Sequence, residues 1–164
     1  MQQLNAPWRS EYYTKKSDGC VFCAISEDTE QKYDSERGVL YRGVECFAVM
    51  NLYPYTPGHF MIIPYKHVDN IETLKPNTWL EMSELVKFGV GVLKSELKAE
   101  GVNIGMNLGA AAGAGIAEHV HYHLVPRWSR DTNFITTIGK TRVNGVPFEG
   151  LYLKLKAAFD ALRA

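Results

Sequence analysis

Three histidines alternate with apolar residues in one short run of the chain. His119, His121 and His123 are separated by Val120 and Tyr122. Residues two apart in a β-strand share a face, so the imidazoles are predicted to point to one side and the intervening residues into the core. Three neighbouring imidazoles compete for protons and add no packing, which disfavours a purely structural role. Two chemistries remain open: metal binding, and nucleophilic attack on phosphorus by a neutral imidazole.

A loop of small residues precedes the histidines. Residues 109–115 read GAAAGAG, and the backbone N–H groups of such a loop can turn toward phosphate oxygens. Glycine-rich turns are common and usually structural, so the loop alone is a weak signal. Its position directly before three histidines favours phosphorus chemistry over metal binding.

A Cys-x-x-Cys pair, Cys20 and Cys23, is the second group of residues suited to chemistry. The chain has three cysteines, an odd number that suits a reducing compartment better than a disulfide framework. Such a pair serves zinc or redox chemistry, and no β-α-β pattern of the thioredoxin type follows it. The remaining cysteine, Cys46, falls in a predicted strand and is expected to be buried packing.

The composition is that of a soluble globular protein acting on a small molecule. Of the 164 residues 46% are hydrophobic and 22% charged, and the formal net charge is zero, which gives no general attraction to nucleic acid or membranes. No apolar run approaches the ~20 residues that span a bilayer, and residues 1–16 lack the apolar core of a signal peptide. We therefore expect a cytoplasmic protein with a small-molecule partner, no nucleic acid partner and no membrane.

The elements that must position these residues form an α+β pattern within one domain of residues 1–164. The first 36 residues are polar and are expected to be irregular. Strands are predicted over residues 39–41, 46–51, 59–64, 102–108 and 118–126, and helices over 78–98 and 151–162. This order predicts a mainly antiparallel sheet with one long helix and a C-terminal helix.

The long helix is predicted from apolar residues that recur at steps of three and four. Thr78 and Glu81 match a capping box at its start, and Gly101 is placed to stop it. The apolar positions are Trp79, Met82, Val86, Val90, Leu93 and Leu97.

Two stretches of the chain resemble the histidine triad (HIT) family. GAGIAEHVHYHLVPRW is similar to the family's signature with its phosphate loop, and FAVMNLYPYTPGHFMIIPYKH is similar to the segment that precedes the signature. The match covers roughly residues 20–128. It implies the HIT fold, which is a five-stranded antiparallel sheet with a long helix, usually in a homodimer whose sheets join.

The resemblance also implies roles for individual residues. The middle histidine, His121, would be the nucleophile and form a covalent nucleotidyl intermediate. His123 would contact the phosphate and help protonate the leaving group, and His59 of the Pro-Gly-His would lie beside the triad. In the substrate site, the ribose would be bound by Asn51, the phosphate or leaving side by Asn107, and the base near Val49 and Phe47, for which a core role is equally open.

The sequence departs from the family before the first histidine. Most HIT proteins carry Gln-Ser/Thr-Val there, whereas this chain has Gly115, Ile116 and Ala117. The hydroxyl that assists the leaving group in those members is absent. Backbone amides at these positions can still bind phosphate, so leaving-group handling is expected to differ.

Zinc-bearing members of the family bind the metal through four residues that all have counterparts in this chain. These are Cys20, Cys23, His67 and His119, and a Cys2His2 set matches tetrahedral structural zinc. We expect the metal to anchor the N-terminal segment to the sheet and to hold the histidine strand in place.

Two further stretches, LNAPWRSEYY and VPRWSRDTNF, are similar to a microbial branch of the family that cleaves diadenosine polyphosphates with water or phosphate. Trp128, Arg130 and Asn133 are candidates for binding the second half of such a substrate, although Trp128 is equally suited to a core or interface position.

Several alternatives stay open at this point. A nucleoside phosphoramidase is the second candidate within the fold. A nucleotide-binding or zinc-dependent scaffold without turnover is less attractive because His121 is intact. A metal–oxygen enzyme using the histidines as ligands lacks a nearby carboxylate other than Glu118, which is expected to face away.

Overall fold

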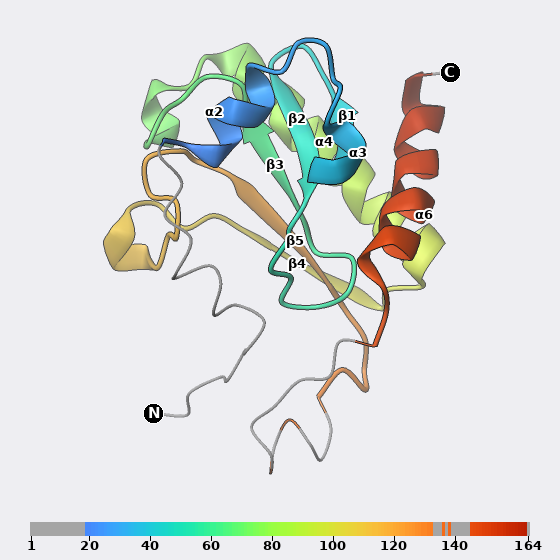
Figure 1. The fold of residues 1–164 in the computed structure, drawn as a ribbon. Coiled ribbons are helices and arrows are strands. Elements are labelled where there is room, and N and C mark those ends of the chain that lie inside the picture. Colours follow the sequence, from blue (N-terminus) through green and yellow to red (C-terminus); the bar gives the residue numbers. More distant parts are fainter. Residues whose placement is uncertain (1–18, 133–135, 137, 139–144, 164) are drawn as a thin grey trace.

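A computed structural model describes residues 19–132, 136, 138 and 145–163 of the chain. Its centre is a five-stranded sheet in the order β1-β2-β3-β5-β4, with every pair of neighbours antiparallel (Figure 1). The expected fold class, α+β with a five-stranded antiparallel sheet, is therefore confirmed. The strands are β1 (Val39–Arg42), β2 (Cys46–Met50), β3 (Phe60–Pro64), β4 (Gly101–Gly105) and β5 (Tyr122–Arg127).

Helices cover both faces of this sheet. The long helix α4 and the C-terminal helix α6 pack on one face, and the short helix α2 packs on the other, with α3 next to β1 (Figure 1). Their bounds are α2 Val21–Ser26, α3 Asp34–Arg37, α4 Pro76–Leu97 and α6 Phe148–Asp160, with 3-10 turns η2 Ile71–Thr73, η3 Ala110–Ala112 and η4 Ala161–Arg163.

Two hydrophobic cores follow from the alternation of side chains along the strands. In β2, Cys46, Ala48 and Met50 face α4 and α6, whereas Phe47 and Val49 face α2. Because both faces are covered, every residue of β2 and β3 is buried. Cys46 is buried as expected, and burial raises the pKa of its thiol.

The start of α4 differs from the expected capping box. The helix begins at Pro76, whose missing N–H suits the first helical position. The hydroxyl of Thr78 donates to the carboxylate of Glu45 at 2.8 Å, and Glu81 accepts from the backbone N–H groups of Val44 and Glu45 at 2.8 and 3.0 Å. The two side chains therefore tie the helix to the β1–β2 turn instead of capping it.

Other element boundaries also differ from the expectations. Helix α4 ends at Leu97 because Lys98 takes the left-handed conformation, with φ 54°, while Gly101 begins β4 instead of stopping the helix. The segment expected to be irregular holds α2 and α3, and α6 begins at Phe148, earlier than expected.

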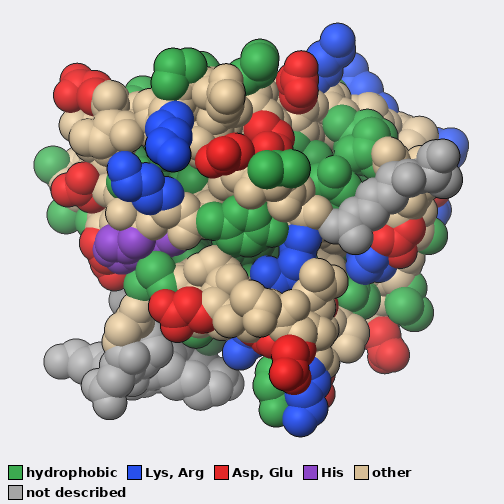
Figure 2. Space-filling model, turned by 90° about the horizontal axis from the view of Figure 1, so that it is seen from above, with side chains coloured by type: hydrophobic (Ala, Val, Ile, Leu, Met, Phe, Trp, Pro, Cys, Tyr) green, Lys and Arg blue, Asp and Glu red, His purple; other side chains and the backbone are tan. Residues whose placement is uncertain are grey.

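The surface agrees with the zero net charge. Figure 2 shows acidic and basic side chains interspersed over the face seen from above. Within the part of the chain that the structure describes, no helix is long and apolar enough to cross a membrane.

Candidate active site

His121 lies directly before β5 and is 5% exposed. Its Nδ1 is 2.8 Å from the carbonyl oxygen of His119. A carbonyl only accepts, so Nδ1 carries the proton and the neutral ring keeps its lone pair on Nε2. Burial lowers the pKa of His121, an effect that the bond to the carbonyl opposes. The result is a neutral imidazole whose Nε2 keeps the lone pair that nucleophilic attack requires.

A chain of hydrogen bonds sets the tautomers of the two neighbouring histidines. The backbone N–H of Tyr55 donates to Nδ1 of His59 at 3.2 Å, which places the proton of the neutral ring on Nε2. That Nε2 lies 3.0 Å from Nδ1 of His123 and donates to it. The neutral His123 ring therefore carries its own proton on Nε2, from which it can donate a hydrogen bond to a leaving group.

The loop between β2 and β3 holds this relay in place. Gly58 has φ +84°, a conformation that favours glycine, and a Cβ there would collide with Leu97. The buried hydroxyl of Thr56 donates to the carbonyl of Pro126 in β5 at 2.8 Å, so the loop is tied to the histidine strand. The side-chain oxygen of Asn51 accepts from the backbone of Tyr53 at 2.9 Å.

Asn51 lies beside these histidines, with its Nδ2 3.5 Å from Nε2 of His59; both atoms are donors in this tautomer, so the approach is a contact and not a hydrogen bond. Tyr55 also lies at this site, although it was not among the residues predicted from the sequence. Its ring is 41% exposed, stacks on His59 with centroids 4.9 Å apart, and lies 6.0 Å from His123. The only signal in the sequence is an aromatic residue four positions before the Pro-Gly-His histidine.

The predicted phosphate loop, residues 109–115, lies between the end of β4 and His119 and contains η3 (Figure 1). Gly105 at the end of β4 pairs with His123, and Asn107 follows two residues later, half-buried. Gly115 is exposed, Ala117 is half-buried, and Ile116 packs against the core under α2. The segment therefore follows β4 along the chain, and through Ile116 it contacts the core under α2.

Two residues expected at the substrate site are packed into the hydrophobic cores. Val49 is 2% exposed in the core under α2, which is a packing position. Trp128 packs against the core under α4 and α6, and its Nε1 donates to the carbonyl of Leu97 at 3.3 Å. The structure therefore does not bring Trp128 to the histidines of its own chain. Arg130 is exposed, and Asn133 lies outside the described residues.

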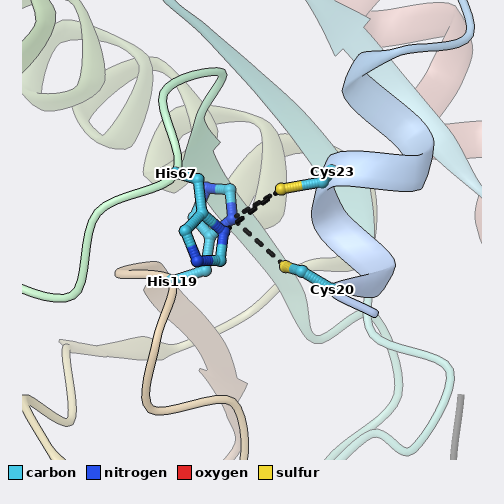
Figure 3. A group of neighbouring side chains, drawn as sticks. All are labelled: Cys20, Cys23, His67 and His119. Carbon is cyan, nitrogen blue, oxygen red and sulfur yellow. Dashed lines mark hydrogen bonds between the residues drawn. The ribbon is translucent and has the colours of Figure 1, made fainter. Parts of the chain in front are cut away.

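The four residues expected to bind zinc do come together (Figure 3). One ligand atom from each of Cys20, Cys23, His67 and His119 lies within 4.8 Å of all the others. Sγ of Cys20 is 3.3 Å from Nδ1 of His119, and Sγ of Cys23 is 3.2 Å from Nδ1 of His67. The cysteines come from α2 and its start, and His67 from the segment after β3.

The chemistry of these donors fits a metal. Nε2 of His119 donates to the carbonyl of Pro64 at 2.9 Å, so its Nδ1 is unprotonated and faces the sulfurs. Burial and the neighbouring Cys20 thiol raise the pKa of Cys23 to about 11. Two adjacent sulfurs thus resist ionising together, and a divalent cation removes that cost by binding both as thiolates. Two thiolates and two imidazoles form a tetrahedral zinc set.

Comparisons with known proteins agree with this geometry. Residues 32–130 match the HIT domain family, and the chain belongs to this family. An AP-4-A phosphorylase of Mycobacterium tuberculosis is 41% identical over 152 residues, which cover 87% of this chain and 76% of the relative. An asymmetrical bis(5'-nucleosyl)-tetraphosphatase of Schizosaccharomyces pombe is 33% identical over 93 residues, which cover 57% of this chain and 50% of the relative.

The structural comparison gives the same result. The crystal structure of a zinc-bound histidine triad family protein from Mycobacterium smegmatis superposes with a TM-score of 0.70 at 27% identity. The match covers 88% of this chain and 96% of the other. The resemblance inferred from the two sequence stretches is thereby confirmed, as is the HIT fold.

Proposed function

We propose that the protein cleaves dinucleoside polyphosphates of the diadenosine tetraphosphate type through a covalent nucleotidyl intermediate on His121. The hydrogen bonds of the histidines carry this proposal, because they leave Nε2 of His121 unprotonated and Nε2 of His123 protonated. One nitrogen can attack while the other donates a hydrogen bond to the leaving group. The names of the two enzyme relatives, which specify AP-4-A and a bis(5'-nucleosyl) tetraphosphate, support the substrate class.

In the first half-reaction, Nε2 of His121 bonds to the α-phosphorus while the bond to the bridging oxygen breaks. The bridging oxygen of the departing nucleoside triphosphate accepts a hydrogen bond from Nε2–H of His123, which stabilises the negative charge that forms there. His59 keeps Nδ1 of His123 hydrogen-bonded, so the proton stays on the side of the leaving group. Asn51 and Asn107 would bind the ribose and phosphate, and the backbone N–H groups of residues 115–117 would replace the missing hydroxyl.

In the second half-reaction, water or inorganic phosphate attacks the nucleotidyl-histidine and the phosphorus–nitrogen bond breaks. The proton of an attacking water is released to solvent, whereas an attacking phosphate oxygen is already ionised, and Nε2–H of His123 remains a hydrogen-bond donor. With water the products of diadenosine tetraphosphate are AMP and ATP, whereas with phosphate they are ADP and ATP.

Two measurements test this function. Quenching the enzyme and labelled substrate in alkaline denaturant, which preserves a phosphorus–nitrogen bond, followed by peptide mass spectrometry, should find the adenylyl group on His121, and a label on any other residue would exclude the mechanism. Product analysis with and without added phosphate then separates the acceptors, because ADP that forms only with phosphate identifies a phosphorylase. A protein that leaves the dinucleotide intact under both conditions overturns the proposal.

Zinc is proposed as a structural metal at Cys20, Cys23, His67 and His119. When bound it supplies a rigid tetrahedral link among α2, the end of β3 and the start of the histidine run. All three cysteines are free thiols, which supports a reducing compartment such as the cytoplasm. Metal analysis should find about one zinc per chain, and a metal-free protein of unchanged stability would remove this site.

A homodimer joined through β4 is also proposed. This strand forms one edge of the sheet, and its residues from Asn103 to Gly105 are exposed, including Ile104 at 47%. Exposed edges with apolar side chains favour pairing with another strand. Sedimentation should give a dimer mass for the native chain and a monomer mass for Ile104→Lys; a monomeric native chain would contradict the proposal.

A further inference from the structure

Phe22 connects the candidate metal site with the candidate nucleophile. It lies in α2 between Cys20 and Cys23 and is 3% exposed. Its ring packs edge-on against His119, with centroids 5.5 Å apart and an interplanar angle of 89°. The same ring lies 5.1 Å from that of His121 at 61°. One buried aromatic side chain thus contacts both a metal-ligand histidine and the attacking histidine.

A second connection runs through the backbone. The side chain of His119 offers Nδ1 to the metal, and its carbonyl accepts the Nδ1 proton of His121. The imidazole of His121 is therefore fixed at two points. The hydrogen bond sets which nitrogen is protonated, and the contact with Phe22 limits rotation of the ring about its side-chain bonds.

The far end of α2 is held without any metal. Arg37 donates to the carbonyl of Ala24 at 2.9 Å, and Arg42 donates to that of Ile25 at 2.9 Å. Both arginines act at the last turn of the helix. The first turn, which carries Phe22, is the part that sulfur–metal bonds at Cys20 and Cys23 would fix.

We propose that Phe22 is a positioning residue through which the metal at the cysteine–histidine site holds the imidazole of His121 in its attacking orientation. The kinetic consequence rests on the proposed function, whereas the structural consequence does not. Phe22 is buried and contacts His121, and it is not exposed to a substrate. Its loss is therefore expected to lower kcat and to leave KM nearly unchanged. An ordinary core residue would lower stability alone.

The substitution Phe22→Leu keeps a buried apolar side chain but removes the ring that contacts His121. We expect kcat to fall about tenfold, because small misplacement of reacting groups is costly, with KM within about twofold of the native value. Ile25→Ala is the matched control, since Ile25 lies on the same helix and in the same core. It should lower the unfolding midpoint and leave kcat unchanged. Phe22→Ile serves as a second variant if Phe22→Leu fails to fold.

Metal removal provides the decisive comparison. If Phe22 transmits the effect of the metal, chelation should lower kcat of the native protein about tenfold and that of Phe22→Leu by much less, because coupled changes are not additive. Equal losses in both proteins would show that Phe22 is only packing. Equal kcat in Phe22→Leu and Ile25→Ala would show the same.

A readout without substrate separates this inference from the proposed function. In nitrogen-15 NMR of the resting, metal-loaded protein, the Nδ1 proton of His121 should be protected from exchange by its bond to His119. Protection should fall on chelation and in Phe22→Leu but persist in Ile25→Ala. Protection that is unaffected by Phe22→Leu overturns the inference, whether or not the protein cleaves a dinucleotide.

Discussion

The two faces of the sheet are built from alternate residues of the same strands, yet different side chains cover them. One face lies under α4 and α6, and the other lies under α2. The first is packed with aliphatic and aromatic side chains from both long helices. The second combines a smaller apolar cluster with the histidines and the cysteine pair. Polar groups on this second face are hydrogen-bonded to one another or to backbone carbonyls, as burial requires. Stability and chemistry are thus separated across the thickness of one sheet.

His121→Ala should have the largest effect on activity. Removal of the nucleophile is expected to lower kcat on the order of 10⁴-fold or more, while circular dichroism and the unfolding midpoint show a folded protein. If the variant cleaves diadenosine tetraphosphate at the native rate, His121 is not the nucleophile and the second face of the sheet does not provide it.

His123→Ala should lower kcat by about 10²- to 10³-fold for a substrate whose leaving group is stabilised by the hydrogen bond from Nε2. The nitrophenyl ester of AMP, whose leaving group departs without this hydrogen bond, should be cleaved at nearly the native rate. The ratio of the two rates measures the role of the Nε2 proton of His123. An equal loss with both substrates would instead assign His123 to binding or packing.

Leu155→Ala tests the opposite face. Leu155 of α6 is fully buried in the core under α4 and α6. Its truncation should reduce the free energy of unfolding by about 2–5 kcal/mol and leave kcat unchanged at temperatures where the variant is folded. Denaturant unfolding measures the loss of stability, and steady-state kinetics on the same sample measures kcat. A large loss of kcat without loss of stability would contradict the division between the faces.

The smallest expected effect is on the pH dependence of stability. Burial lowers the pKa of His121 in the folded protein, so the unfolded chain takes up the proton first as the pH falls. The stability contributed by the neutral ring is therefore complete above the unfolded value of about 6.5 and is lost as the pH decreases toward the lowered folded value. The unfolding free energies of the native protein and His121→Ala should converge as the pH falls. If the two free energies keep a constant difference over this pH range, the pKa of His121 is not lowered in the folded protein.

The features that could be predicted from the sequence are those encoded by local periodicity or by a compact motif. The alternation at residues 119–124 predicts which side chains face the histidine side, and the steps of three and four predict α4. The Cys-x-x-Cys and the two distant histidines were joined through the family resemblance, and the structure places their ligand atoms together.

The features that could not be predicted depend on partners far along the chain. Thr78 and Glu81 have capping-box spacing, but residues of the β1–β2 turn bind them instead. Helix α2 has only six residues and no capping side chain, so contacts with Arg37 and Arg42 stabilise it. The position of Trp128, by contrast, could have been predicted, because it lies an odd number of residues after His121 and such residues lie on opposite faces of a strand.

The exposure of His67 sets how a bound metal would exchange with its surroundings. His67 is exposed, whereas His119 is buried and both cysteines are half-buried. A competing ligand would therefore approach from the His67 side, and the bond to His67 would break first. The zinc content of the protein is therefore expected to depend on the zinc available during purification. Protein from zinc-poor medium should contain less zinc than the same protein purified with zinc.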